Sequence, residues 1–382
     1  MTDSILVTGG AGFIGSHVVD LLLERGHNVR VLDSLVPQVH GKDQARPAYL
    51  GSDVELIQGD VRDRRAVKRA LEGQTMLCYQ AASVGVGQSM YDIESYVSNN
   101  TLGAAVVLDV LANERHSVRK IVVASSMSIY GEGKYRCPRY MDSSHAEYFA
   151  PRVRTRKQLE RHDWEPRCPN CGTPGESVPC DEDKSLYPTS VYAVTKRDHE
   201  ELFLSVGAAY GIPVVALRYF NTYGERQSLS NPYTGVAAIF ASQLLSGNPP
   251  VIFEDGAQSR DFTHVSDVAR ANVLALEGDG ANHHAVNVGT GQRTTLLMLV
   301  ELLRARLDPE HRIQPTITGR FREGDIRHCF ASVDTAKKLL GYEPNVRFDA
   351  GVDRLVSWAK EQQVRDDTAN AFAELQKNRL IR

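Results

Sequence analysis

The chain has 382 residues, of which 42% are hydrophobic and 24% charged, a composition typical of a globular protein with room for one large and one smaller domain. Its formal net charge of −3 argues against nucleic acid or an anionic membrane as a partner. The sequence lacks an apolar run of membrane-spanning length and a signal-peptide pattern at its start, so we expect a cytoplasmic protein. Its six cysteines are therefore expected to be metal ligands or buried thiols before disulfides.

The first part of the chain alternates short apolar runs with stretches of helical periodicity. A strand is predicted at 4–8, and after a glycine-rich turn a helix is predicted over 16–25, closed by Gly26. Further strands are predicted at 29–33, 54–58, 76–79, 120–125 and 214–218. Alternation of this kind predicts an α/β fold with a doubly wound, parallel Rossmann sheet.

The glycine-rich turn at 9–15 follows a strand and opens a helix, which is the setting of a dinucleotide cradle. Gly9 allows the tight turn, Gly12 lets the backbone approach a pyrophosphate, and Gly15 lets the helix pack on the strand. The helix N-terminus then offers free N–H groups to the phosphates. Asp33 ends the next strand, where it can bond the adenosine ribose and repel a 2′-phosphate, so NAD is favoured over NADP. A glycine-rich turn without a ligand is the alternative.

Tyr192 and Lys196 lie four residues apart and therefore share one face of a predicted helix. A free phenol has a pKa near 10, which an adjacent ammonium lowers. A base tuned in this way contributes about 10²–10⁴ in rate, and Lys196 can also reach the nicotinamide ribose. Ser126 ends a strand where ligands collect in open α/β sheets, so its hydroxyl can bond the same substrate oxygen as Tyr192. The alternative for Tyr192 and Lys196 alone is a pair on a helix surface.

The stretch 133–185 interrupts the alternation and is rich in arginine, proline, cysteine and acidic residues. Cys168 and Cys171 have the spacing of a zinc knuckle, and Cys137 and Cys180 flank them. Because so polar a stretch has few residues for a core of its own, we expect the four thiolates to hold a structural Zn²⁺. Unpaired thiols or a disulfide are the alternatives. Buried packing positions are expected for the two remaining cysteines, Cys78 and Cys329.

These patterns predict four parts along the chain. A Rossmann domain that binds NAD is expected over 1–132, and a Cys-rich insertion, stabilised by zinc, over 133–185. The Rossmann domain resumes over 186–220 with the catalytic helix. A smaller α/β substrate-binding lobe is expected over 221–382, with some segments returning to the Rossmann domain. The tail beyond Lys360 is predicted to be polar and helical and to carry no recognisable chemistry.

Six motifs spread along the chain are similar to one family. They lie at 8–15, 125–131, 192–196, 218–224, 260–265 and 322–325. With these motifs the sequence resembles the extended short-chain dehydrogenase/reductases that modify nucleotide sugars, over almost the whole chain apart from the insertion. The resemblance implies a retained NAD, a dTDP- or UDP-hexose as substrate, and a homodimer whose contact includes the helices near Asn99 and Tyr192.

The resemblance also implies which residues contact each ligand. Cofactor contacts are expected from Gly9, Gly12, Phe13, Ile14, Gly15, Asp33, Asp60, Val61, Ala81, Ala82, Asn99, Tyr192, Lys196 and Phe220, and Ser34, Ser83 and Ser125 complete the expected cofactor site. Contacts to the nucleotide diphosphate and its ribose are expected from Asn221, Arg260, Arg322 and Asp325, with Asn231 and Tyr233 beside them. The expected neighbours of the sugar are Ser83, Gln88 and Ser128. The planar fork of an arginine suits a pyrophosphate, although any one arginine alone could equally make a surface salt bridge.

The two residues directly after Ser126 narrow the choice of reaction. The 4,6-dehydratases carry an Asp-Glu pair where this chain has Met127 and Ser128, so dehydration is disfavoured. The segments 85–90 and 324–330 are most similar to the sugar 4-epimerases, including the dTDP-L-rhamnose 4-epimerase type. The implied reaction oxidises the sugar at C4 to a transient 4-keto sugar, which turns in the site and is reduced on its opposite face. NAD ends as it began, so no second redox substrate is required.

Several other activities stay open. A UDP-hexose 4-epimerase is equally compatible with the motifs, and a UDP-glucuronate decarboxylase shares the same base and cofactor. A reductase of 4-keto sugars would consume NADH stoichiometrically. The alternative outside enzymes is a scaffold protein that senses NAD, which would need none of Ser126, Tyr192 and Lys196.

Overall fold

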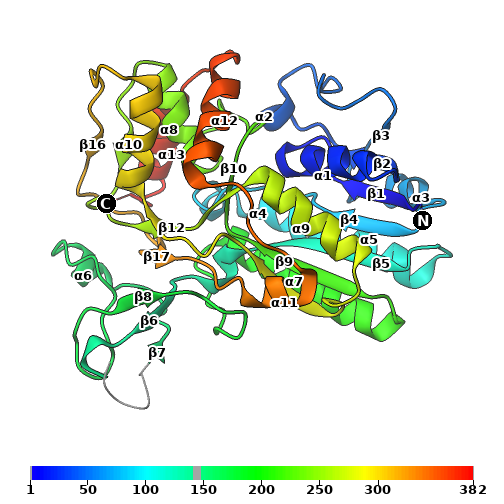
Figure 1. The fold of residues 1–382 in the computed structure, drawn as a ribbon, viewed down its shortest axis with the longest axis horizontal. Coiled ribbons are helices and arrows are strands. Elements are labelled where there is room, and N and C mark those ends of the chain that lie inside the picture. Colours follow the sequence, from blue (N-terminus) through cyan, green and yellow to red (C-terminus); the bar gives the residue numbers. More distant parts are fainter. Residues whose placement is uncertain (1, 141–147, 382) are drawn as a thin grey trace.

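A seven-stranded parallel sheet forms the centre of the larger lobe (Figure 1). We describe residues 2–140 and 148–381 of a computed structural model. The strands are β1 (Ser4–Thr8), β2 (Asn28–Asp33), β3 (Glu55–Gln58), β4 (Met76–Tyr79), β5 (Lys120–Ser126), β9 (Val214–Tyr219) and β14 (His284–Val288). Their order is β14-β9-β5-β4-β1-β2-β3, and every pair is parallel. Because the order reverses between β1 and β4, the predicted doubly wound fold is confirmed.

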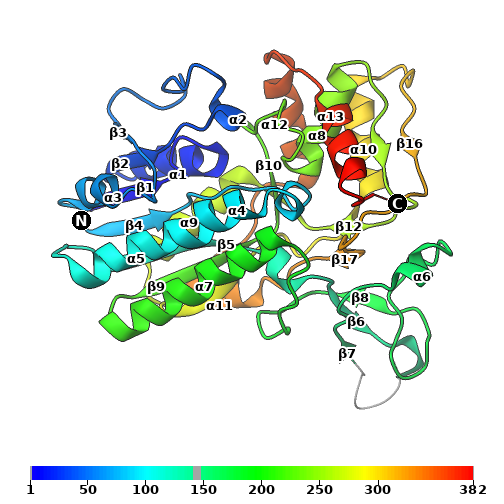
Figure 2. The same ribbon diagram turned by 180° about the vertical axis from the view of Figure 1, so that it is seen from behind.

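Helices cover both faces of this sheet. On the face seen in Figure 1 lie α1 (Phe13–Glu24), α9 (Val265–Glu277) and α11 (Asp334–Leu340). On the face seen in Figure 2 lie α3 (Arg64–Leu71), α5 (Gly103–Asn113) and α7 (Val191–Tyr210). Each face closes over its own apolar cluster, and β5 and β9 are buried along their whole length. Strands buried on both faces have continuous apolar runs in their sequence, which is why they were predictable.

The structure contains the predicted first helix, but the predicted first residue of that helix is wrong. The helix α1 begins at Phe13 rather than at residue 16, because its first turn belongs to the glycine-rich segment, where apolar periodicity gives no signal. Its end agrees with the prediction, since Gly26 has a φ of 81°, a left-handed conformation that glycine adopts without strain.

The smaller lobe packs three helices around its own core. They are α8 (Val236–Leu245), α10 (Leu296–Leu307) and α12 (Phe348–Lys360). Short strand pairs and triplets join this lobe to the sheet: β10 (Asn221–Tyr223) with β13 (Phe262–His264), β11 (Val251–Ile252) with β16 (Thr316–Ile317), and β12 (Ser259–Arg260) with β15 (Thr294–Thr295) and β17 (His328–Cys329). The remaining helices are α2 (Pro37–His40), α4 (Ile93–Tyr96) and α13 (Thr368–Lys377). Within 221–382, β14 is a strand of the sheet in the larger lobe, and α9 packs against that sheet.

The predicted insertion projects away from the sheet, below the smaller lobe in Figure 1. It contains an antiparallel sheet of β6 (Lys134–Arg136), β7 (Tyr148–Phe149) and β8 (Glu176–Val178), together with the short helix α6 (Arg156–Leu159). Residues 141–147 of the insertion lie outside the described part of the chain. A small apolar cluster of Leu159, Trp164 and Phe321 joins the insertion to the smaller lobe.

A buried ion pair ties the insertion to the smaller lobe. The guanidinium of Arg154 donates to both carboxylate oxygens of Glu254, at 2.9 and 2.8 Å, and to the backbone oxygen of Asp325 at 3.0 Å. Both partners of the ion pair have side chains that are only 1% exposed. Breaking such a pair by removing one partner typically costs about 3–5 kcal/mol, because it leaves an uncompensated buried charge. The insertion is therefore firmly docked.

The structure corrects one predicted metal ligand. The sulfurs of Cys137, Cys168 and Cys171 lie together, but Cys180 is not brought to them. Cys180 instead forms an isolated parallel bridge with Ala331, just after β17, and places its sulfur 3.7 Å from that of Cys329, among buried apolar side chains. Sequence proximity within the insertion was misleading because Cys180 is already part of the chain's return to the main core. The predicted burial of Cys78 and Cys329 is confirmed.

Among the described residues, no helix is both long and apolar enough to cross a membrane.

Candidate active site

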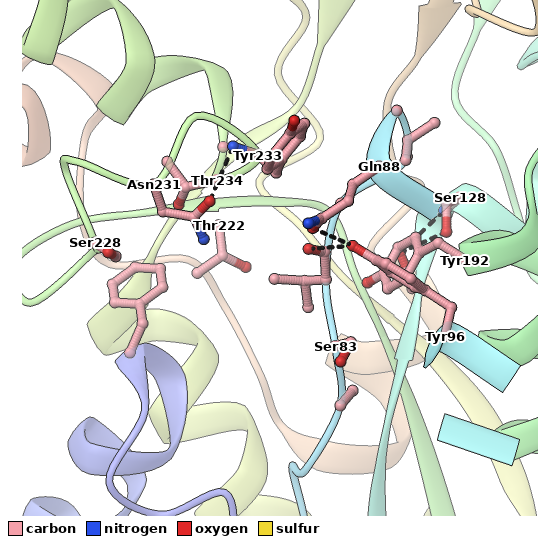
Figure 3. A pocket seen from close by; sticks show the side chains of 18 of the residues that line it. Ser83, Gln88, Tyr96, Ser128, Tyr192, Thr222, Ser228, Asn231, Tyr233 and Thr234 are labelled. Carbon is pink, nitrogen blue, oxygen red and sulfur yellow. Dashed lines mark hydrogen bonds between the residues drawn. The ribbon is translucent and has the colours of Figure 1, made fainter. Parts of the chain in front are cut away.

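One cavity of about 860 Å³ runs between the two lobes. All the predicted cofactor and substrate residues contribute to its lining, although they come from segments spread over more than three hundred positions of the chain. Figure 3 shows part of this cavity, with Ser83, Gln88 and Tyr96 on one side and Asn231, Tyr233 and Thr234 on the other. The three clustered cysteines are not among the lining residues.

The glycine-rich turn is packed so tightly that it excludes side chains at Gly9 and Gly15. A Cβ on Gly9 would lie 2.8 Å from the backbone nitrogen of Ala81, and Gly9 also has a φ of 69°. A Cβ on Gly15 would lie 2.2 Å from the backbone oxygen of Gly9. A Cβ on Gly12 would lie 3.3 Å from the backbone oxygen of Gly9, which is also a tight contact, and Gly12 lines the cavity. The turn thus allows a ligand to approach the backbone at Gly12.

The N-terminus of α1 fits the pyrophosphate of a dinucleotide. Its N-cap is Gly12, no described side chain caps it, and no acidic residue lies in its first turn. The N–H groups of this first turn therefore face the cavity together with the positive end of the helix dipole, and Phe13 and Ile14 line the same wall. These features make the cavity a good fit for NAD.

Asp33 is held in place by the backbone around it. Its carboxylate accepts hydrogen bonds from the N–H groups of Ala11, at 3.0 Å, and Leu35, at 2.9 Å. His40 Nε2 lies 3.8 Å from the same carboxylate. Burial lowers the pKa of His40, while Asp33 acts in the opposite direction. Ser34 follows Asp33 along the cavity wall. The acid is therefore preorganised at the edge where the adenosine ribose is expected, and His40 is a neighbour that the sequence did not indicate.

The cavity wall at Asp60 and Val61, two of the expected cofactor contacts, carries a pair of charged side chains. The carboxylate of Asp60 pairs with Arg62, whose Nη2 lies 2.6 Å from Asp60 Oδ2, and Val61 lines the cavity between them. Burial opposes ionisation of Asp60, but its hydrogen bonds with Arg62 hold its pKa below the ordinary value. This arginine is turned to Asp60, so it does not provide a free cation for a 2′-phosphate.

Two neighbouring asparagines organise the cavity wall after β4. Asn99 Nδ2 donates to Ser83 Oγ at 2.9 Å, and both residues line the cavity beside Ala81 and Ala82. Asn100 is fully buried, and its side chain accepts from the backbone N–H of Ser83 at 2.7 Å. Both lie in a π-helical stretch, Val97–Leu102, of the kind that recurs at functional sites.

The catalytic helix α7 is capped so that its first turn is rigid. Ser190 is its N-cap, and the Ser190 hydroxyl accepts from the N–H of Ala193 at 3.1 Å. The N–H of Tyr192 donates to the hydroxyl of Ser89 at 3.0 Å, which ties the helix to the segment after β4. The backbone at Tyr192 and Ala193 is therefore held by two independent hydrogen bonds.

Ser126 and Tyr192 meet in the cavity, as predicted. Burial raises the pKa of the Tyr192 phenol, and the hydrogen bond with Ser126 partly offsets this shift. Ser126 Oγ also accepts hydrogen bonds from the backbone N–H of Ser128, at 3.2 Å, and from the Ser128 hydroxyl, at 2.9 Å. These bonds orient the Ser126 hydroxyl towards Tyr192, beside which Figure 3 places Ser128. Ser128 thus acts on the site through Ser126.

Lys196 differs from the expectation in its partner. Its Nζ lies 3.3 Å from Nδ1 of His199, one turn further along α7. Burial lowers the pKa of Lys196 to about 7, and burial together with Lys196 holds the pKa of His199 well below its ordinary value. The sequence predicts that the ammonium lowers the pKa of Tyr192, whereas burial is the largest effect on both residues in this structure. The reason is that helical spacing shows which residues share a face of the helix, but not how deeply that face is buried from water.

Ser125 lines the cavity but its side chain serves the core. Its hydroxyl donates to Glu200 Oε2 at 2.7 Å, and the same carboxylate pairs with Arg218 at 2.6 Å. The Ser125 hydroxyl therefore takes part in a buried network with Glu200 and Arg218. A cofactor can contact the other atoms of Ser125 that line the cavity.

Gln88, an expected neighbour of the sugar, lies across the cavity from Asn231, which is expected beside the nucleotide (Figure 3). Gln88 Oε1 accepts from the hydroxyl of Tyr96 at 3.1 Å, and Asn231 Oδ1 accepts from the backbone N–H of Tyr233 at 3.0 Å (Figure 3). The Nε2 of Gln38 donates to both amide oxygens, at 3.2 Å for Gln88 and 3.1 Å for Asn231, and so bridges the two walls.

The arginines expected at the diphosphate lie together with their acid. Arg322 donates to Asp325 Oδ2 through two nitrogens, at 3.0 and 2.8 Å, and Arg260 lies 3.9 Å from Asp325 Oδ1. Although burial opposes it, this pair of cations holds the pKa of Asp325 below its ordinary value. The Oδ1 of Asn221 is buried without a hydrogen-bond partner in the described structure, and Phe220 lies beside it in the wall. Two cations suit an anionic ligand, and the unsatisfied amide oxygen suits a hydrogen-bond donor on that ligand.

Sequence reasoning missed part of the lining. The tail beyond Lys360 was predicted to carry no chemistry, but Thr368, Ala371, Phe372 and Leu375 of α13 line the cavity, followed by Leu380. The ring of Phe372 also packs edge-to-face on that of Phe253, over which the guanidinium of Arg322 lies. The spacing of the apolar residues in α13 predicts that one face of the helix is buried, but it does not predict that this face lines the cavity.

The sheet is doubly wound, and the glycine cradle lies at its topological switch point. Ser126, Tyr192 and Lys196 line the same cavity as the cradle. Together these features define an enzyme of the short-chain dehydrogenase/reductase class. Residues 5–153 and 169–289 match the family described as "NAD dependent epimerase/dehydratase family". The chain belongs to this family. The match leaves out 154–168, which lie in the insertion.

Relatives and solved structures agree with that assignment. The chain is 31% identical to a dTDP-L-rhamnose 4-epimerase of Burkholderia thailandensis over 362 residues, which cover 94% of this chain and 95% of the relative. It is 28% identical to the UDP-glucose 4-epimerase of Thermotoga maritima, solved with UDP-glucose, at a TM-score of 0.75 and covering 94% and 99% of the two chains. It is 29% identical to the Thermus thermophilus UDP-glucose 4-epimerase solved with NAD, at a TM-score of 0.72 and covering 94% and 100%.

Proposed function

We propose that this protein is an NAD-dependent 4-epimerase of nucleotide-diphosphate sugars. The observation that carries the proposal is the continuity of one cavity, which joins the N-terminus of α1, the Ser126–Tyr192 pair and the arginines around Asp325. The first part suits a dinucleotide, the second a reacting alcohol and the third a diphosphate. The relatives whose names state an activity at C4 of a sugar support the same function.

NAD would be held by the cradle around Gly12, by Asp33 at its adenosine ribose and by Lys196 at its nicotinamide ribose. When bound, NAD supplies the site with an acceptor and donor of hydride. The fit of the site rests on the Gly12 backbone in the cavity wall and on the N-terminus of α1, which no described side chain caps.

The chain's own residues handle the proton. Tyr192 accepts the proton of the sugar 4-hydroxyl and later returns it, and Ser126 holds the same oxygen by a hydrogen bond. The ordinary pKa of a phenol is too high for a base at neutral pH, and burial raises that of Tyr192 further in this structure. A charged Lys196 offsets this effect by stabilising the phenolate, because opposite charges at close range favour the ionised form.

The nucleotide part of the substrate anchors the molecule away from the reacting carbon. Arg260, Arg322 and Asn221 are proposed to bind the diphosphate and its ribose, and Tyr233 and Asn231 to lie beside the nucleotide. The sugar is proposed to lie near Ser83, Gln88 and Ser128. Binding energy fixed on the nucleotide leaves the 4-keto sugar free to turn, which a change of configuration at C4 requires.

A panel of substrates tests the proposal. The purified protein is incubated with UDP- and dTDP-hexoses, without added cofactor, and the released sugars are analysed. We expect one substrate to interconvert with its 4-epimer at constant NADH absorbance. Release of carbon dioxide from a UDP-hexuronate would instead establish a decarboxylase, and stoichiometric consumption of added NADH a reductase. Tight NAD binding with no conversion of any member would support the scaffold alternative.

We further propose that the protein forms a homodimer through the outer faces of α7 and of the helical segment around Asn99. Four large apolar side chains are exposed there: Ile93, Val97, Leu102 and Val194, each between 43% and 52%. The two helical segments that carry these side chains pack side by side (Figure 2). Water-exposed apolar area of this extent is typical of a covered interface.

Light scattering coupled to gel filtration tests the dimer. A doubly charged variant, Val97→Lys with Val194→Lys, is expected to elute as a monomer, because burying two ammonium groups at an interface is unfavourable. The matched control is Met298→Lys, at a 57% exposed apolar position on α10, which is expected to leave the mass unchanged. A wild type that is monomeric at micromolar concentration would refute the dimer.

A further inference from the structure

Three cysteines of the insertion place their sulfurs together. The Sγ atoms of Cys137, Cys168 and Cys171 all lie within 4.8 Å of one another, and those of Cys137 and Cys171 are 3.4 Å apart. Cys137 follows β6, whereas the other two lie in a turn some thirty positions further along the chain. Cys137 and Cys168 are buried, and Cys171 is half-buried. A group of three thiols with this burial is uncommon without a function.

The turn that carries Cys168 and Cys171 is held in a defined conformation by backbone hydrogen bonds. The N–H of Cys168 donates to the oxygen of Thr173 at 2.8 Å, and the N–H of Gly172 donates back to the oxygen of Cys168 at 2.9 Å. Gly172 has a φ of 70°, which a residue with a side chain adopts only with strain. Arg167 and Pro174 form an antiparallel bridge that closes the turn. Both sulfurs are therefore held on one side of the turn by its own backbone.

The distances suit metal ligands better than a disulfide. At a Zn–S distance of about 2.3 Å, two thiolates of a tetrahedral site lie about 3.8 Å apart, within the range seen here. All three cysteines are free thiols, and a single disulfide would leave the third sulfur unused. Thiolates are soft ligands that favour zinc over calcium or magnesium.

We propose that the insertion binds one Zn²⁺ through the thiolates of Cys137, Cys168 and Cys171. Binding releases the thiol protons to solvent and leaves the metal with three sulfur ligands. Among the described residues, no further histidine, cysteine, aspartate or glutamate belongs to this group. The ion links β6 to the closed turn, and so joins two ends of the insertion.

The position of the group indicates a structural role. None of the three cysteines lines the active-site cavity. The insertion has few apolar residues of its own, and the buried cluster of Leu159, Trp164 and Phe321 includes a side chain from the smaller lobe. A stretch with so small a core gains most of its stability from a cross-link, which a metal supplies.

The metal content of the purified full-length protein tests the proposal. The protein is prepared without chelators or added metal and weighed by native mass spectrometry, with elemental analysis in parallel. We expect about one zinc per chain in the wild type. The variant Cys171→Ser is expected to bind zinc at least about 100-fold more weakly, since even outer partners of a metal ligand are worth about 10–100-fold. Cys329→Ser, which changes a free cysteine outside the group, is the matched control and is expected to keep its zinc.

A second measurement covers the case in which Cys171→Ser does not fold. In the wild type the three cysteines are expected to resist alkylation until a chelator is added, and peptide mass analysis identifies which cysteines become labelled. A folded wild type that carries less than about a tenth of a zinc per chain after dialysis against Zn²⁺ would overturn the proposal. Equal labelling with and without chelator, iron in place of zinc, or an equal loss of zinc in Cys329→Ser would do the same.

Discussion

The ammonium of Lys196 lies 3.3 Å from Nδ1 of His199, in a part of α7 where both side chains are buried. No described carboxylate pairs with this lysine, and burial lowers its pKa to about 7. The lysine therefore changes its charge in the range in which an enzyme at neutral pH works. His199 is a positioning residue in this arrangement, since it holds the lysine rather than the reacting alcohol.

A buried lysine of this kind is expected to destabilise the protein. The shift of its pKa from 10.5 to about 7 corresponds to on the order of 4–5 kcal/mol, at about 1.4 kcal/mol per unit. Lys196→Met removes this cost and loses a hydrogen bond to His199 worth about 1–2 kcal/mol, so we expect a gain of on the order of 3 kcal/mol at pH 7. Urea unfolding of the cofactor-free protein measures the gain.

The pH dependence of that gain is set by the direction in which the lysine pKa moves. Between about pH 7 and 10.5 the unfolded lysine binds a proton that the folded one does not, so the stability of the wild type rises with pH in this window. The advantage of Lys196→Met is therefore largest at pH 7 and below, and shrinks as the pH approaches 10.5. Lys337→Met, at an exposed lysine, is the control and is expected to change stability by about 0.5 kcal/mol or less. A Lys196→Met protein less stable than the wild type at pH 7 would contradict the argument.

Removing the phenol oxygen tests the base. Tyr192→Phe is expected to lower kcat by at least about 10²-fold, because proton transfer by a positioned base typically contributes 10²–10⁴. NAD binding, measured by fluorescence titration, is expected to change by less than about 3-fold, since only one of many cofactor contacts is lost. Tyr210→Phe, at the exposed end of the same helix, is the control. Turnover by Tyr192→Phe within a factor of ten of the wild type would rule out this role.

The choice between NAD and NADP is expected to depend on the charge of Asp33. Asp33→Asn keeps one oxygen as an acceptor, for the N–H of either Ala11 or Leu35, and loses the negative charge. A hydrogen bond to a charged group is worth about 1.5–3 kcal/mol, so NAD affinity is expected to fall about 10–100-fold. NADP affinity is expected to rise or to stay constant, because the repulsion of its 2′-phosphate is removed. Titration with both cofactors measures the ratio, and an equal loss for the two would disprove the role of the charge.

Acid is expected to loosen the docking of the insertion at Glu165. Burial opposes ionisation of this residue, but His328 and Arg327 lower its pKa to about 2. Because the folded pKa lies below the ordinary value of 4.5, the interaction stabilises the protein above pH 4.5 and is lost as the pH falls towards 2. Glu165→Gln should therefore lower stability near pH 7 by about 1 kcal/mol, a value that allows for partial exposure of the side chain, and the difference should vanish in acid.

Unfolding at several pH values between neutrality and the onset of acid denaturation checks this expectation. Glu160→Gln is the matched control, because Glu160 also pairs with an arginine of the insertion but is exposed. A Glu165→Gln effect that grows as the pH falls would contradict the assigned direction of the pKa shift.

The parts of the site that lie within one motif were predictable from the sequence. The cradle around Gly12 and the Tyr192–Lys196 pair depend on local geometry, because a glycine in a tight turn or a helical spacing of four has the same consequence in any fold. The arginines around Asp325 were predictable only through resemblance to a family. Their convergence with the cradle in one cavity is a property of the fold.

Contacts between distant segments were not predictable. Cys180 pairs with Cys329 rather than with the cysteines nearest to it in sequence, because the chain re-enters the core there. Leu375 reaches the cavity from the far end of the chain, and periodicity could indicate its helix but not the surface that the helix covers. His199 was missed for a further reason, since the dryness of the α7 face comes from the helices packed on it.

Arg154 of the insertion donates to the backbone oxygen of Asp325, a residue proposed to lie at the substrate diphosphate, so the insertion supports that part of the cavity wall. The insertion lies between β5 and α7 in the sequence, and it supports the cavity wall at Asp325, which comes 171 positions after Arg154. If the insertion depends on zinc for its shape, cells starved of that metal will contain an enzyme with an unaltered base and a weakened hold on its nucleotide. Nutrient supply would then change KM more than kcat.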